Sequence, residues 1–259
     1  MSALRARCPD CRTLTAVAIG PEYQCHSCGR EFAAGLVRVP RAWGDDGEQM
    51  AAAASMALPW PEAAVVDEET LDAQLATTAR ELPERPLVLG GCCCAHIGAV
   101  EGLAARHDRI GVIWLDAHGD LNTPTSSPSG NEWGMPLRML IDGGAVAAAD
   151  VALIGARNLD PPEVAFIAEA GVHDTAGAVL ERVDTVYVAL DCDVFAPGEL
   201  TVFMPEPGGP GIGDVERLFC DLRARTTIAG AGITGLAPDP ANVVPLERLT
   251  RNLFSAPPV

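Results

Sequence analysis

The sequence predicts an α/β protein with a three-layer α/β/α architecture, in which helices cover both faces of a mainly parallel sheet. Short, almost continuously apolar segments alternate with longer segments of mixed polarity over most of the chain. This pattern is typical of parallel strands buried on both faces. Polar side chains also gather directly after several apolar segments, where parallel sheets place their binding sites. Two Cys-x-x-Cys pairs near the amino terminus predict a small module before the sheet.

The composition restricts the class of protein. The chain has 259 residues, of which 48% are hydrophobic, and a formal net charge of −17 with no lysine. The negative charge disfavours nucleic acid and anionic membranes as partners, because like charges repel, and it suits a small cationic substrate. No segment approaches the roughly 18 to 20 apolar residues of a membrane span, and the amino terminus lacks the apolar core of a signal peptide. We therefore expect a cytoplasmic protein.

The module at residues 1–36 contains "CPDC" at 8–11 and "CHSC" at 25–28. Two such pairs can hold one zinc ion in a tetrahedron of thiolates. The intervening "RTLTAVAIGPEYQ" has the strand formers and the Gly-Pro turn of a hairpin. So short a segment buries little apolar surface, so a metal would supply folding energy. The module resembles a zinc ribbon with a structural or docking role, and its expected zinc ligands are Cys8, Cys11, Cys25 and Cys28.

The rest of the chain, 37–259, is expected to form the α/β domain. After a loop-like connection around 35–62, Asp67 is expected to cap a helix that ends at Pro83. Strands and helices then alternate to the end of the chain. Expected strands cover 86–91, 109–116, 150–155, 184–191 and 227–237, and expected helices cover 51–54, 95–106, 135–141, 161–170, 212–224 and the tail from 244.

Two strand ends carry clusters of metal-binding side chains. Asp116, His118 and Asp120 follow the apolar "VIWL", and Asp191 and Asp193 close "VYVALDCD". Carboxylates at the mouth of a buried strand are costly unless something pairs with them, and a divalent cation is a natural partner. Four carboxylates and one imidazole exceed the needs of one ion, so the sequence predicts a site for two metal ions.

Four segments, "LVLGG", "WLDAHGDLNTP", "SPSGNEWGMP" and "ALDCDVFAP", occur in the order and spacing of the ureohydrolase superfamily, which includes arginases and agmatinases. The chain resembles this superfamily over roughly 87–259. The resemblance implies a parallel sheet sandwiched by helices and two Mn²⁺ ions. It also implies a metal-bridging hydroxide that hydrolyses a guanidinium group to urea and an amine, and assembly into homo-oligomers.

The resemblance assigns roles to the strand-end residues. It implies that Asp116 and Asp191 bridge the two ions and that His118 and Asp193 hold one of them. Asp120 would hold the other ion and orient the hydroxide, which makes it the expected catalytic side chain. The implied substrate is a small cationic guanidino compound.

Three polar residues of the following loop match substrate-binding positions of the superfamily. They are Asn122, Ser129 and Asn131, which in the superfamily bind the polar end of the substrate. The loop is rich in Ser, Pro and Gly, so ordinary turn residues explain the three equally well.

The run "GGCCCAH" departs from the pattern of the superfamily, whose first metal ligand is a His in a Gly-Gly-Asp-His-Ser motif. Cys93 occupies that position here. His96, one helical turn later, is the alternative ligand, but Gly90 and Gly91 anchor the alignment and favour Cys93. A thiolate is a softer ligand than imidazole, so Zn²⁺, Fe²⁺ or Co²⁺ becomes acceptable beside Mn²⁺.

Three further departures concern the chemistry. Trp133 stands where arginases carry a His, Gly235 where the superfamily usually carries a Glu, and Ala196 where it carries an Asp. We therefore expect a metal-dependent hydrolase of a linear C–N bond in a guanidino, amidine or related compound. The alternative is a catalytically impaired metalloprotein with a regulatory or partner-docking role.

Overall fold

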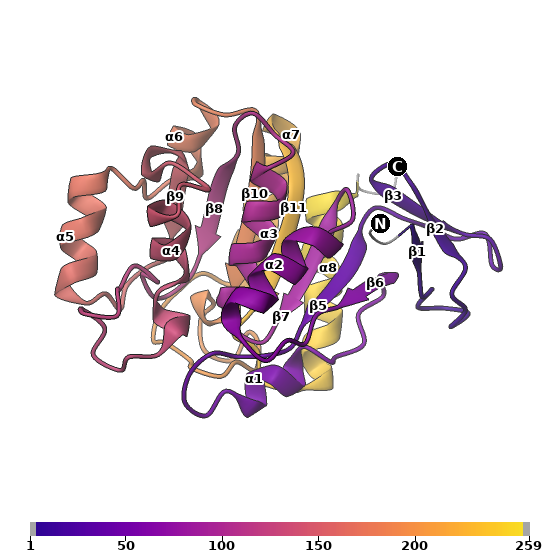
Figure 1. Cartoon of the computed structure of the whole chain (residues 1–259), viewed down its shortest axis with the longest axis horizontal. Helices are drawn as coiled ribbons and strands as arrows, with labels where there is room; N and C mark the ends of the chain where they lie inside the picture. Colours follow the sequence, from indigo (N-terminus) through magenta and orange to yellow (C-terminus); the bar gives the residue numbers. More distant parts are fainter. Residues whose placement is uncertain (1–3, 256–259) are drawn as a thin grey trace.

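The computed structural model describes residues 4–255 and has a seven-stranded sheet at its centre (Figure 1). The strand order is β6-β5-β7-β11-β10-β8-β9, and all neighbouring strands are parallel. The strands are β5 (Gly35–Val39), β6 (Glu62–Val65), β7 (Pro86–Gly90), β8 (Gly111–Leu115), β9 (Val151–Ile154), β10 (Thr185–Asp191) and β11 (Thr227–Thr234). Their carboxyl ends therefore lie along one edge of the sheet.

The side chains of the central strands alternate between two hydrophobic clusters, one on each face. In β10, Val186 and Val188 pack in one cluster, whereas Tyr187 and Ala189 pack in the other. This is the two-residue period of an extended strand that is covered on both faces. It explains why the central strands have almost no polar side chains.

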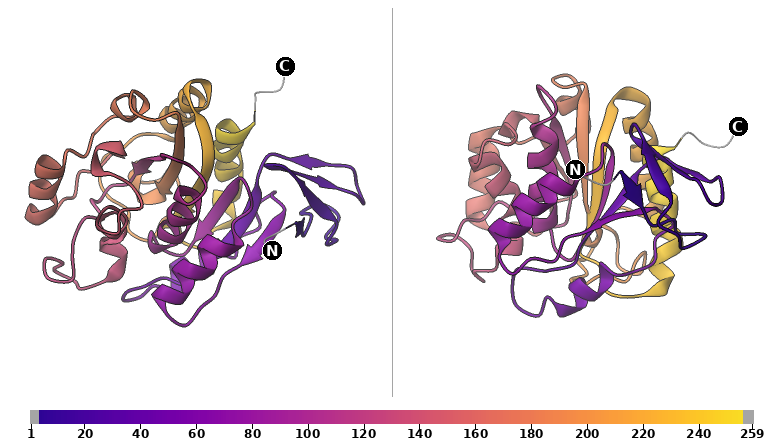
Figure 2. Two further views of the ribbon diagram at one scale, coloured as in Figure 1. Left: turned by 45° about the horizontal axis from the view of Figure 1, so that its top comes forward. Right: turned by 45° about the vertical axis from the view of Figure 1, so that its right-hand side comes forward.

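Helices cover both faces and complete the predicted three-layer fold, which the structure confirms (Figure 2). One face packs against α6 (Ala176–Leu180), α7 (Ile212–Arg225) and α8 (Val243–Phe254). The other packs against α2 (Leu71–Glu81), α3 (Cys94–Ala104), α4 (Pro136–Asp142) and α5 (Pro161–Ala170). The short α1 (Glu48–Ala53) lies near the edge where the strands end (Figure 1). Within the described part of the chain, no helix combines the length and the apolar character that crossing a membrane requires.

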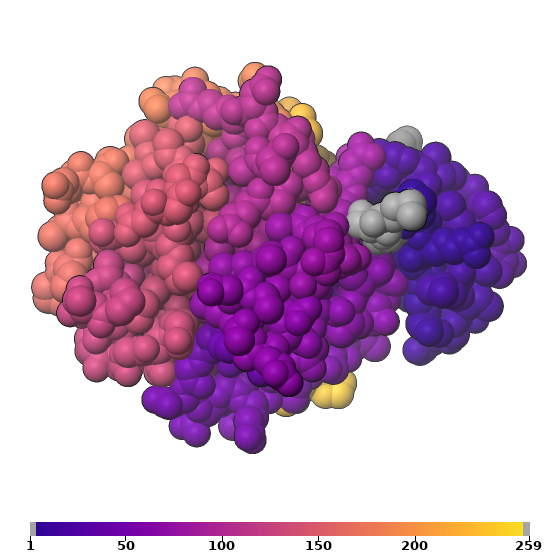
Figure 3. Space-filling view, viewed as in Figure 1, coloured from indigo at the N-terminus to yellow at the C-terminus, as the bar shows by residue number. Residues whose placement is uncertain are grey.

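The amino-terminal module is a four-stranded antiparallel sheet that forms a lobe beside the larger body (Figure 3). Its strands are β1 (Arg5–Ala6), β2 (Ala16–Ile19), β3 (Glu22–Cys25) and β4 (Glu31–Phe32). The hairpin predicted between the cysteine pairs is confirmed as β2 and β3. Tyr23 and Phe32 belong to the same hydrophobic cluster as one face of the large sheet. The two sheets therefore share a continuous core.

The segment 35–62 is not the loop-like connection that we expected. It contains β5 and α1 and reaches the start of β6, and β5 runs across the expected division between residues 36 and 37. The sequence of β5, "GLVRV", gives a weak strand signal because an arginine interrupts a very short apolar run. The expected cap at Asp67 is also wrong. Helix α2 begins after Thr70, whose hydroxyl accepts a hydrogen bond from Ala73 N at 3.3 Å.

Candidate functional site

A cavity of about 300 Å³ lies at the carboxyl edge of the sheet, beyond the ends of β8 and β10. Parallel strands end at the same edge, so segments far apart in the sequence meet there. The metal and substrate candidates predicted from the sequence all line this cavity: Cys93, Asp116, His118, Asp120, Asn122, Ser129, Asn131, Asp191 and Asp193. His96, the alternative ligand, is not among the lining residues.

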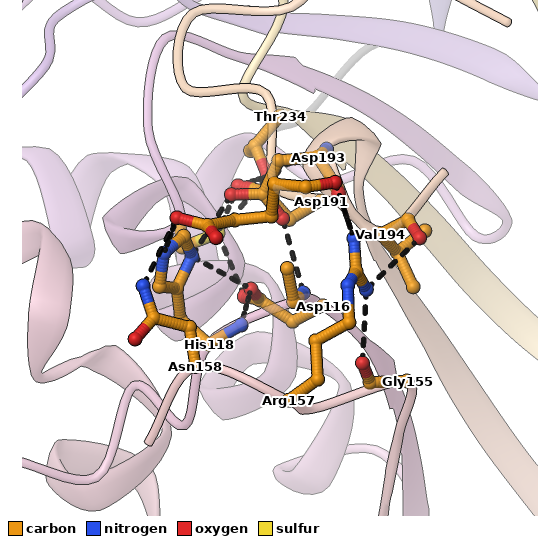
Figure 4. Close-up of polar contacts among 12 residues, drawn as sticks. Asp116, His118, Gly155, Arg157, Asn158, Asp191, Asp193, Val194 and Thr234 are labelled. Atoms are coloured by element: carbon orange, nitrogen blue, oxygen red, sulfur yellow. Dashed lines mark hydrogen bonds and ion pairs between the residues drawn. The ribbon is translucent and has the colours of Figure 1, made fainter. Parts of the chain in front are cut away.

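Five of the six candidate ligands form two groups that share Asp116, and Asp120 belongs to neither group. One group joins Cys93, Asp116 and Asp191, and the other joins Asp116, His118 and Asp193; the ligand atoms of each group lie within 4.8 Å of one another. His118 Nδ1 lies 2.9 Å from Asp193 Oδ2 and 3.5 Å from Asp116 Oδ1 (Figure 4). Cys93 Sγ lies 2.9 Å from Asp191 Oδ2. A carboxylate common to two groups suits a pair of adjacent cations.

Main-chain N–H groups orient three of these carboxylates. His118 N donates to Asp116 Oδ1 at 2.7 Å. Asp193 N donates to Asp191 Oδ1 at 3.0 Å, within the 3-10 turn η3 (Cys192–Val194) that follows β10. Ala117 N donates to Asp193 Oδ1 at 3.0 Å and so ties the end of β8 to that turn. The backbone of the two strand ends therefore sets the positions of the carboxylates before any ligand binds.

The buried end of the cavity is here called the floor, and its candidate ligands are Cys93, Asp116, His118, Asp120, Asp191 and Asp193. Asp120 reaches the floor through an uncommon backbone conformation. Its φ of 53° lies in the left-handed region, which costs a non-glycine residue about 1–2 kcal/mol. The side chain is 5% exposed, and its Oδ2 has no hydrogen-bond partner in the part of the chain that the structure describes. A buried carboxylate oxygen without a partner is costly. An additional group that contacts this oxygen would remove that cost.

The floor concentrates negative charge in buried surroundings. Burial, followed by the charges of Asp116 and Asp191, raises the pKa of Asp120 well above its ordinary value. Burial would lower the pKa of His118, but hydrogen bonds to Asp116 and Asp193 and their charges outweigh it and raise that pKa to about 12. The described residues that line the cavity include no Lys or Arg. His118 is thus the one cationic side chain beside several carboxylates, and a set of carboxylates, one imidazole and one thiol fits two divalent metal ions.

Cys93 and His96 occupy different places relative to the cavity. Cys93 lines the floor, whereas His96 is fully buried behind it. His96 Nε2 lies 3.2 Å from Thr234 Oγ1 and Nδ1 lies 3.0 Å from the Tyr187 hydroxyl, and burial lowers the pKa of His96 to about 3. Thr234 Oγ1 lies 3.1 Å from Cys93 Sγ and 3.2 Å from Asp191 Oδ2. Thr234 therefore links His96 to the floor.

The turn from β7 into α3 is packed closely against the segment that follows β5. A Cβ added to Gly91 would lie 2.2 Å from the Pro40 carbonyl oxygen, so this approach requires glycine. Cys92 Sγ accepts a hydrogen bond from Trp43 N at 3.4 Å, and Cys94 is fully buried in α3. The three cysteines are therefore unequal, and Cys93 Sγ is the sulfur that lies beside the carboxylates of the floor.

The three loop candidates, Asn122, Ser129 and Asn131, have partners within the protein. Asn122 Nδ2 donates to Asp160 Oδ2 at 2.8 Å, and Asn131 Oδ1 accepts from Asp45 N at 3.1 Å. Ser129 Oγ accepts from Asn131 N at 3.2 Å. These bonds stabilise the loop, and the same residues line the cavity. A role as turn residues and a role in substrate binding are therefore compatible.

Sequence reasoning missed two acidic residues of the cavity wall. Asp160 and Glu163 follow β9 and line the cavity. Glu163 accepts hydrogen bonds from Leu121 N at 3.0 Å and from Asp160 N at 2.9 Å, which joins the loop after β8 to the start of α5. The rule that found the other clusters, polar residues after an apolar strand, also applies to "VALIGARNLDPPE" and would have found them.

Sequence reasoning also missed two residues that organise the loops beside the floor. The Arg157 guanidinium donates to the main-chain oxygens of Gly155 at 3.0 Å and Asp193 at 3.0 Å (Figure 4). Glu206 Oε1 lies 3.3 Å from His118 Nε2. Glu206 lies far from any strand end in the sequence and stands between two prolines, so no local pattern indicates its place.

The three departures from the superfamily pattern have different surroundings. Trp133 and Gly235 line the cavity, whereas Ala196 does not. Gly235 has a φ of +71°, and a Cβ at this position would lie 2.0 Å from Asp191 Oδ1. Glycine is therefore required by the backbone here, and a glutamate could not replace it without moving Asp191.

A second group of ligand atoms lies in the amino-terminal module. The sulfur atoms of Cys8, Cys11, Cys25 and Cys28 lie within 4.8 Å of one another, with 3.7 Å between Cys8 and Cys28 and 3.5 Å between Cys11 and Cys25. Four thiolates at the usual zinc–sulfur distance of about 2.3 Å would lie roughly 3.8 Å apart in a tetrahedron. The observed separations agree with that geometry.

Comparisons with known proteins agree with the fold and the motifs. The model of the arginase family matches residues 45–244. The arginase of Bacillus caldovelox is 36% identical in an alignment of 172 residues that covers 54% of this chain and 56% of that relative. The crystal structure of arginase from Bacillus subtilis has a TM-score of 0.76 at 23% identity and covers 87% of this chain and 99% of that one. The arginase structure from Bacillus caldovelox has a TM-score of 0.73 at 25% identity and covers 86% of this chain and 98% of that one.

The sequence match to the curated relative thus spans little more than half of its length, whereas the structural likeness covers almost the whole of each solved chain. The family model covers most of the described sheet and every candidate ligand at the strand ends. The amino-terminal module lies before the matched residues. This chain therefore belongs to the arginase family.

Proposed function

We propose that the protein is a metal-dependent hydrolase of a linear C–N bond in a small cationic guanidino or amidine compound. The observation that carries this proposal is the buried acidic floor, whose donors fit divalent cations and face a cavity of about 300 Å³. A cavity of this volume is at the small end of the range for ligand sites. The acidic wall at Asp160 and Glu163 adds to the attraction for a cation.

Two divalent ions would be held by the two groups of the floor. Asp116 belongs to both groups, so its carboxylate would be shared by the two ions. Asp191 belongs to the group of Cys93 and Asp116, and it would be the second shared carboxylate, as the resemblance to the family implies. His118 and Asp193 would complete one ion site.

Cys93 and Asp120 would complete the other ion site. Cys93 is favoured over His96 because its sulfur lies beside two floor carboxylates, whereas both ring nitrogens of His96 contact Tyr187 and Thr234. Burial raises the pKa of the Cys93 thiol, as do the neighbouring carboxylates, so the thiol keeps its proton until a cation binds and displaces it. A thiolate ligand favours Zn²⁺, Fe²⁺ or Co²⁺ more than an all-oxygen and nitrogen set would, and Mn²⁺ is the expected ion of the family.

The bound ions would lower the pKa of a water molecule, which would supply a nucleophile at neutral pH, and they would also polarise the substrate carbon. The chain's own residues would orient the reactants. Asp120 Oδ2, which has no partner among the described residues, is placed to accept a proton on the cavity floor. His118 Nε2 faces Glu206 Oε1 at 3.3 Å, so a proton on that nitrogen has an acceptor at the edge of the floor.

The four module cysteines would bind one structural zinc ion. The Thr15 hydroxyl lies 3.4 Å from Cys25 Sγ, and this hydrogen bond lowers the pKa of Cys25 to about 5, whereas burial raises the pKa of Cys8 to about 12. All four sulfurs would therefore become thiolates only as zinc binds and displaces the remaining protons. The shared hydrophobic cluster indicates a role in stabilising the edge of the large sheet at β5 and β6.

The test is release of urea or ammonia from a panel of guanidino, amidine and amide compounds by metal-loaded protein, together with metal content. Asp116→Asn should lower turnover by about 10³-fold or more and remove core metal, because Asp116 serves both groups. Asp184→Asn, an exposed position before β10, is the matched control and should leave both unchanged.

A second pair of variants separates the ligand alternatives. Cys93→Ser should lose core metal and keep the module zinc, whereas His96→Gln should keep most core metal. Core metal that depends on His96 and not on Cys93 would contradict the assignment. Full core sites with no product from any panel compound would contradict the hydrolase proposal and favour a metalloprotein with a docking role.

A further inference from the structure

One wall of the cavity is apolar and aromatic. Trp133 lies in the 3-10 turn η1 (Glu132–Gly134), and Phe203 lies in the loop after η3. Their rings pack edge to face, with centroids 5.9 Å apart and planes at 65°. Met50 of α1 and Met204 extend the same lining. The cavity therefore combines an acidic floor with an apolar wall. We call the surface formed by Trp133 and Phe203 the aromatic wall.

Main-chain hydrogen bonds hold the backbone of both aromatic residues, and their rings pack against each other. Trp133 N donates to the Trp43 main-chain oxygen at 3.1 Å, and a Cβ added to Gly44 would lie 2.6 Å from the indole, so the ring rests directly on that glycine. Phe203 N donates to the Gly235 main-chain oxygen at 2.9 Å, which ties the backbone of Phe203 to the segment after β11 beside the floor. An aromatic surface held in advance loses little conformational entropy when a ligand packs on it.

The charges of the cavity disfavour one class of ligand. If Cys93 binds as a thiolate, the floor carries five negative charges, from this sulfur and four carboxylates, and two divalent ions supply four positive charges. Asp160 and Glu163 add further acidic groups to the lining, and the described lining residues include no Lys or Arg. A carboxylate on the substrate would therefore meet like charges without an ionic partner.

We propose that Trp133 and Phe203 determine specificity, and that the substrate carries its guanidino or amidino group on an apolar, preferably aryl-bearing, tail without a carboxylate. The inference rests on the proposed function, because the floor is taken to receive the cationic group. The tail then packs on the aromatic wall, where aromatic contacts add to the burial of apolar surface. The volume of about 300 Å³ limits the substrate to a small molecule.

The test uses the full metal-loaded chain and a series of guanidines with one alkyl spacer and four different ends: phenyl, methyl, amine and carboxylate. Binding is measured by titration calorimetry and turnover by urea release. The wild type should bind the phenyl-ended compound at least about 10-fold more tightly than the carboxylate-ended one. Trp133→Gln and Phe203→Ala should each weaken phenyl binding by about 10-fold and change carboxylate binding little.

Two further variants control for folding and for aromatic surface. Trp133→Phe keeps an aromatic ring on the wall and should retain most of the preference. Phe166→Ala removes a half-buried ring of α5 that stacks under Arg138 outside the cavity, and it should change neither compound. This variant therefore reports effects of ring removal that do not involve the wall.

The binding measurements test the specificity proposal, and the product measurements test the hydrolase proposal separately. The specificity proposal is overturned if the wild type binds the phenyl-ended and carboxylate-ended compounds equally, or if it prefers the carboxylate-ended one. It is also overturned if the preference for the phenyl-ended compound survives in both Trp133→Gln and Phe203→Ala. Failure of every compound to bind overturns it as well. If the phenyl-ended compound binds through the wall but yields no urea or ammonia, the hydrolase proposal fails and the binding proposal stands.

Discussion

The molecule contains two clusters of side chains of the kinds that hold metal ions, and the chain builds them in different ways. The module cysteines come from two turns within about twenty residues, and Cys28 among them is exposed. The floor of the cavity is assembled from β7, β8 and β10, and its carboxylates are almost completely buried. The first cluster depends on local spacing, and the second depends on the topology of the sheet.

This difference predicts different roles for the ions. In the small module, a metal would replace the core that so short a segment cannot build, so its removal should act on stability. On the floor, the surrounding sheet already provides the core, and the carboxylates repel one another. A metal would there balance charge, so its removal should act on function more than on folding.

The largest effect on stability is expected from the module. Cys25→Ser should abolish zinc binding there and destabilise the protein by about 4 kcal/mol at a zinc concentration a thousandfold above the dissociation constant. Unfolding of the module would also expose Tyr23 and Phe32, which pack in the shared cluster. The measurement is denaturant unfolding with and without chelator. Cys220→Ser, on α7 away from both clusters, is the control.

An unchanged midpoint in Cys25→Ser would show that the module is an independent appendage. A large loss of core metal in the same variant would show instead that the two clusters are coupled through β5 and β7. Either result would contradict the assignment of a stabilising role to the module metal and a functional role to the floor metals.

A smaller effect is expected behind the floor. Thr234→Val removes the hydroxyl that contacts Cys93, Asp191 and His96, so core metal affinity should fall by about 10- to 100-fold. Competition with a chelating dye measures this affinity. Thr250→Val is the matched control, because Thr250 is a buried threonine of α8 whose hydroxyl bonds to the Leu246 oxygen. Equal metal affinities in the two variants would show that the carboxylates are positioned without Thr234.

The smallest effect concerns Asp150, a buried carboxylate that the protein balances with its own cations. Its oxygens accept from Arg109 at 2.6 Å and Arg182 at 2.8 Å. Burial would raise its pKa, but these hydrogen bonds outweigh burial and lower the pKa below the ordinary value of 3.8. The stabilisation is therefore present above the unfolded pKa and is lost as the pH falls toward the folded pKa.

Asp150→Asn should lose about 1–2 kcal/mol of stability at pH 7, because both arginines are half exposed and solvent screens the pair. Urea unfolding at several pH values should show the wild type and the variant converging below about pH 4. A difference that stays constant with pH would assign the effect to packing. The contrast with the floor, where no Arg or Lys lines the cavity in the described chain, would then lose its electrostatic basis.

The same difference explains what the sequence could predict. The cysteine cluster and the hairpin between its pairs follow from local spacing, and the parallel sheet follows from apolar runs such as β8 and β10. The meeting of Cys93 with Asp116 and Asp191 was accessible because all three follow strands of one parallel sheet. β5 was missed because its run is short and contains Arg38. Glu206 was missed because a long loop brings it to His118, and local sequence patterns do not predict long-range contacts made by loops.

Gly235 has a consequence for how this site can change over generations. A Cβ there would overlap Asp191 Oδ1, and the backbone has a φ of +71°. Any single substitution at this position therefore displaces a floor carboxylate before it can offer a new contact to a substrate. A lineage that acquired a side chain here would first need a compensating change at Asp191 or in the turn after β11. The order of mutations at this position is thus constrained, because the compensating change must come first.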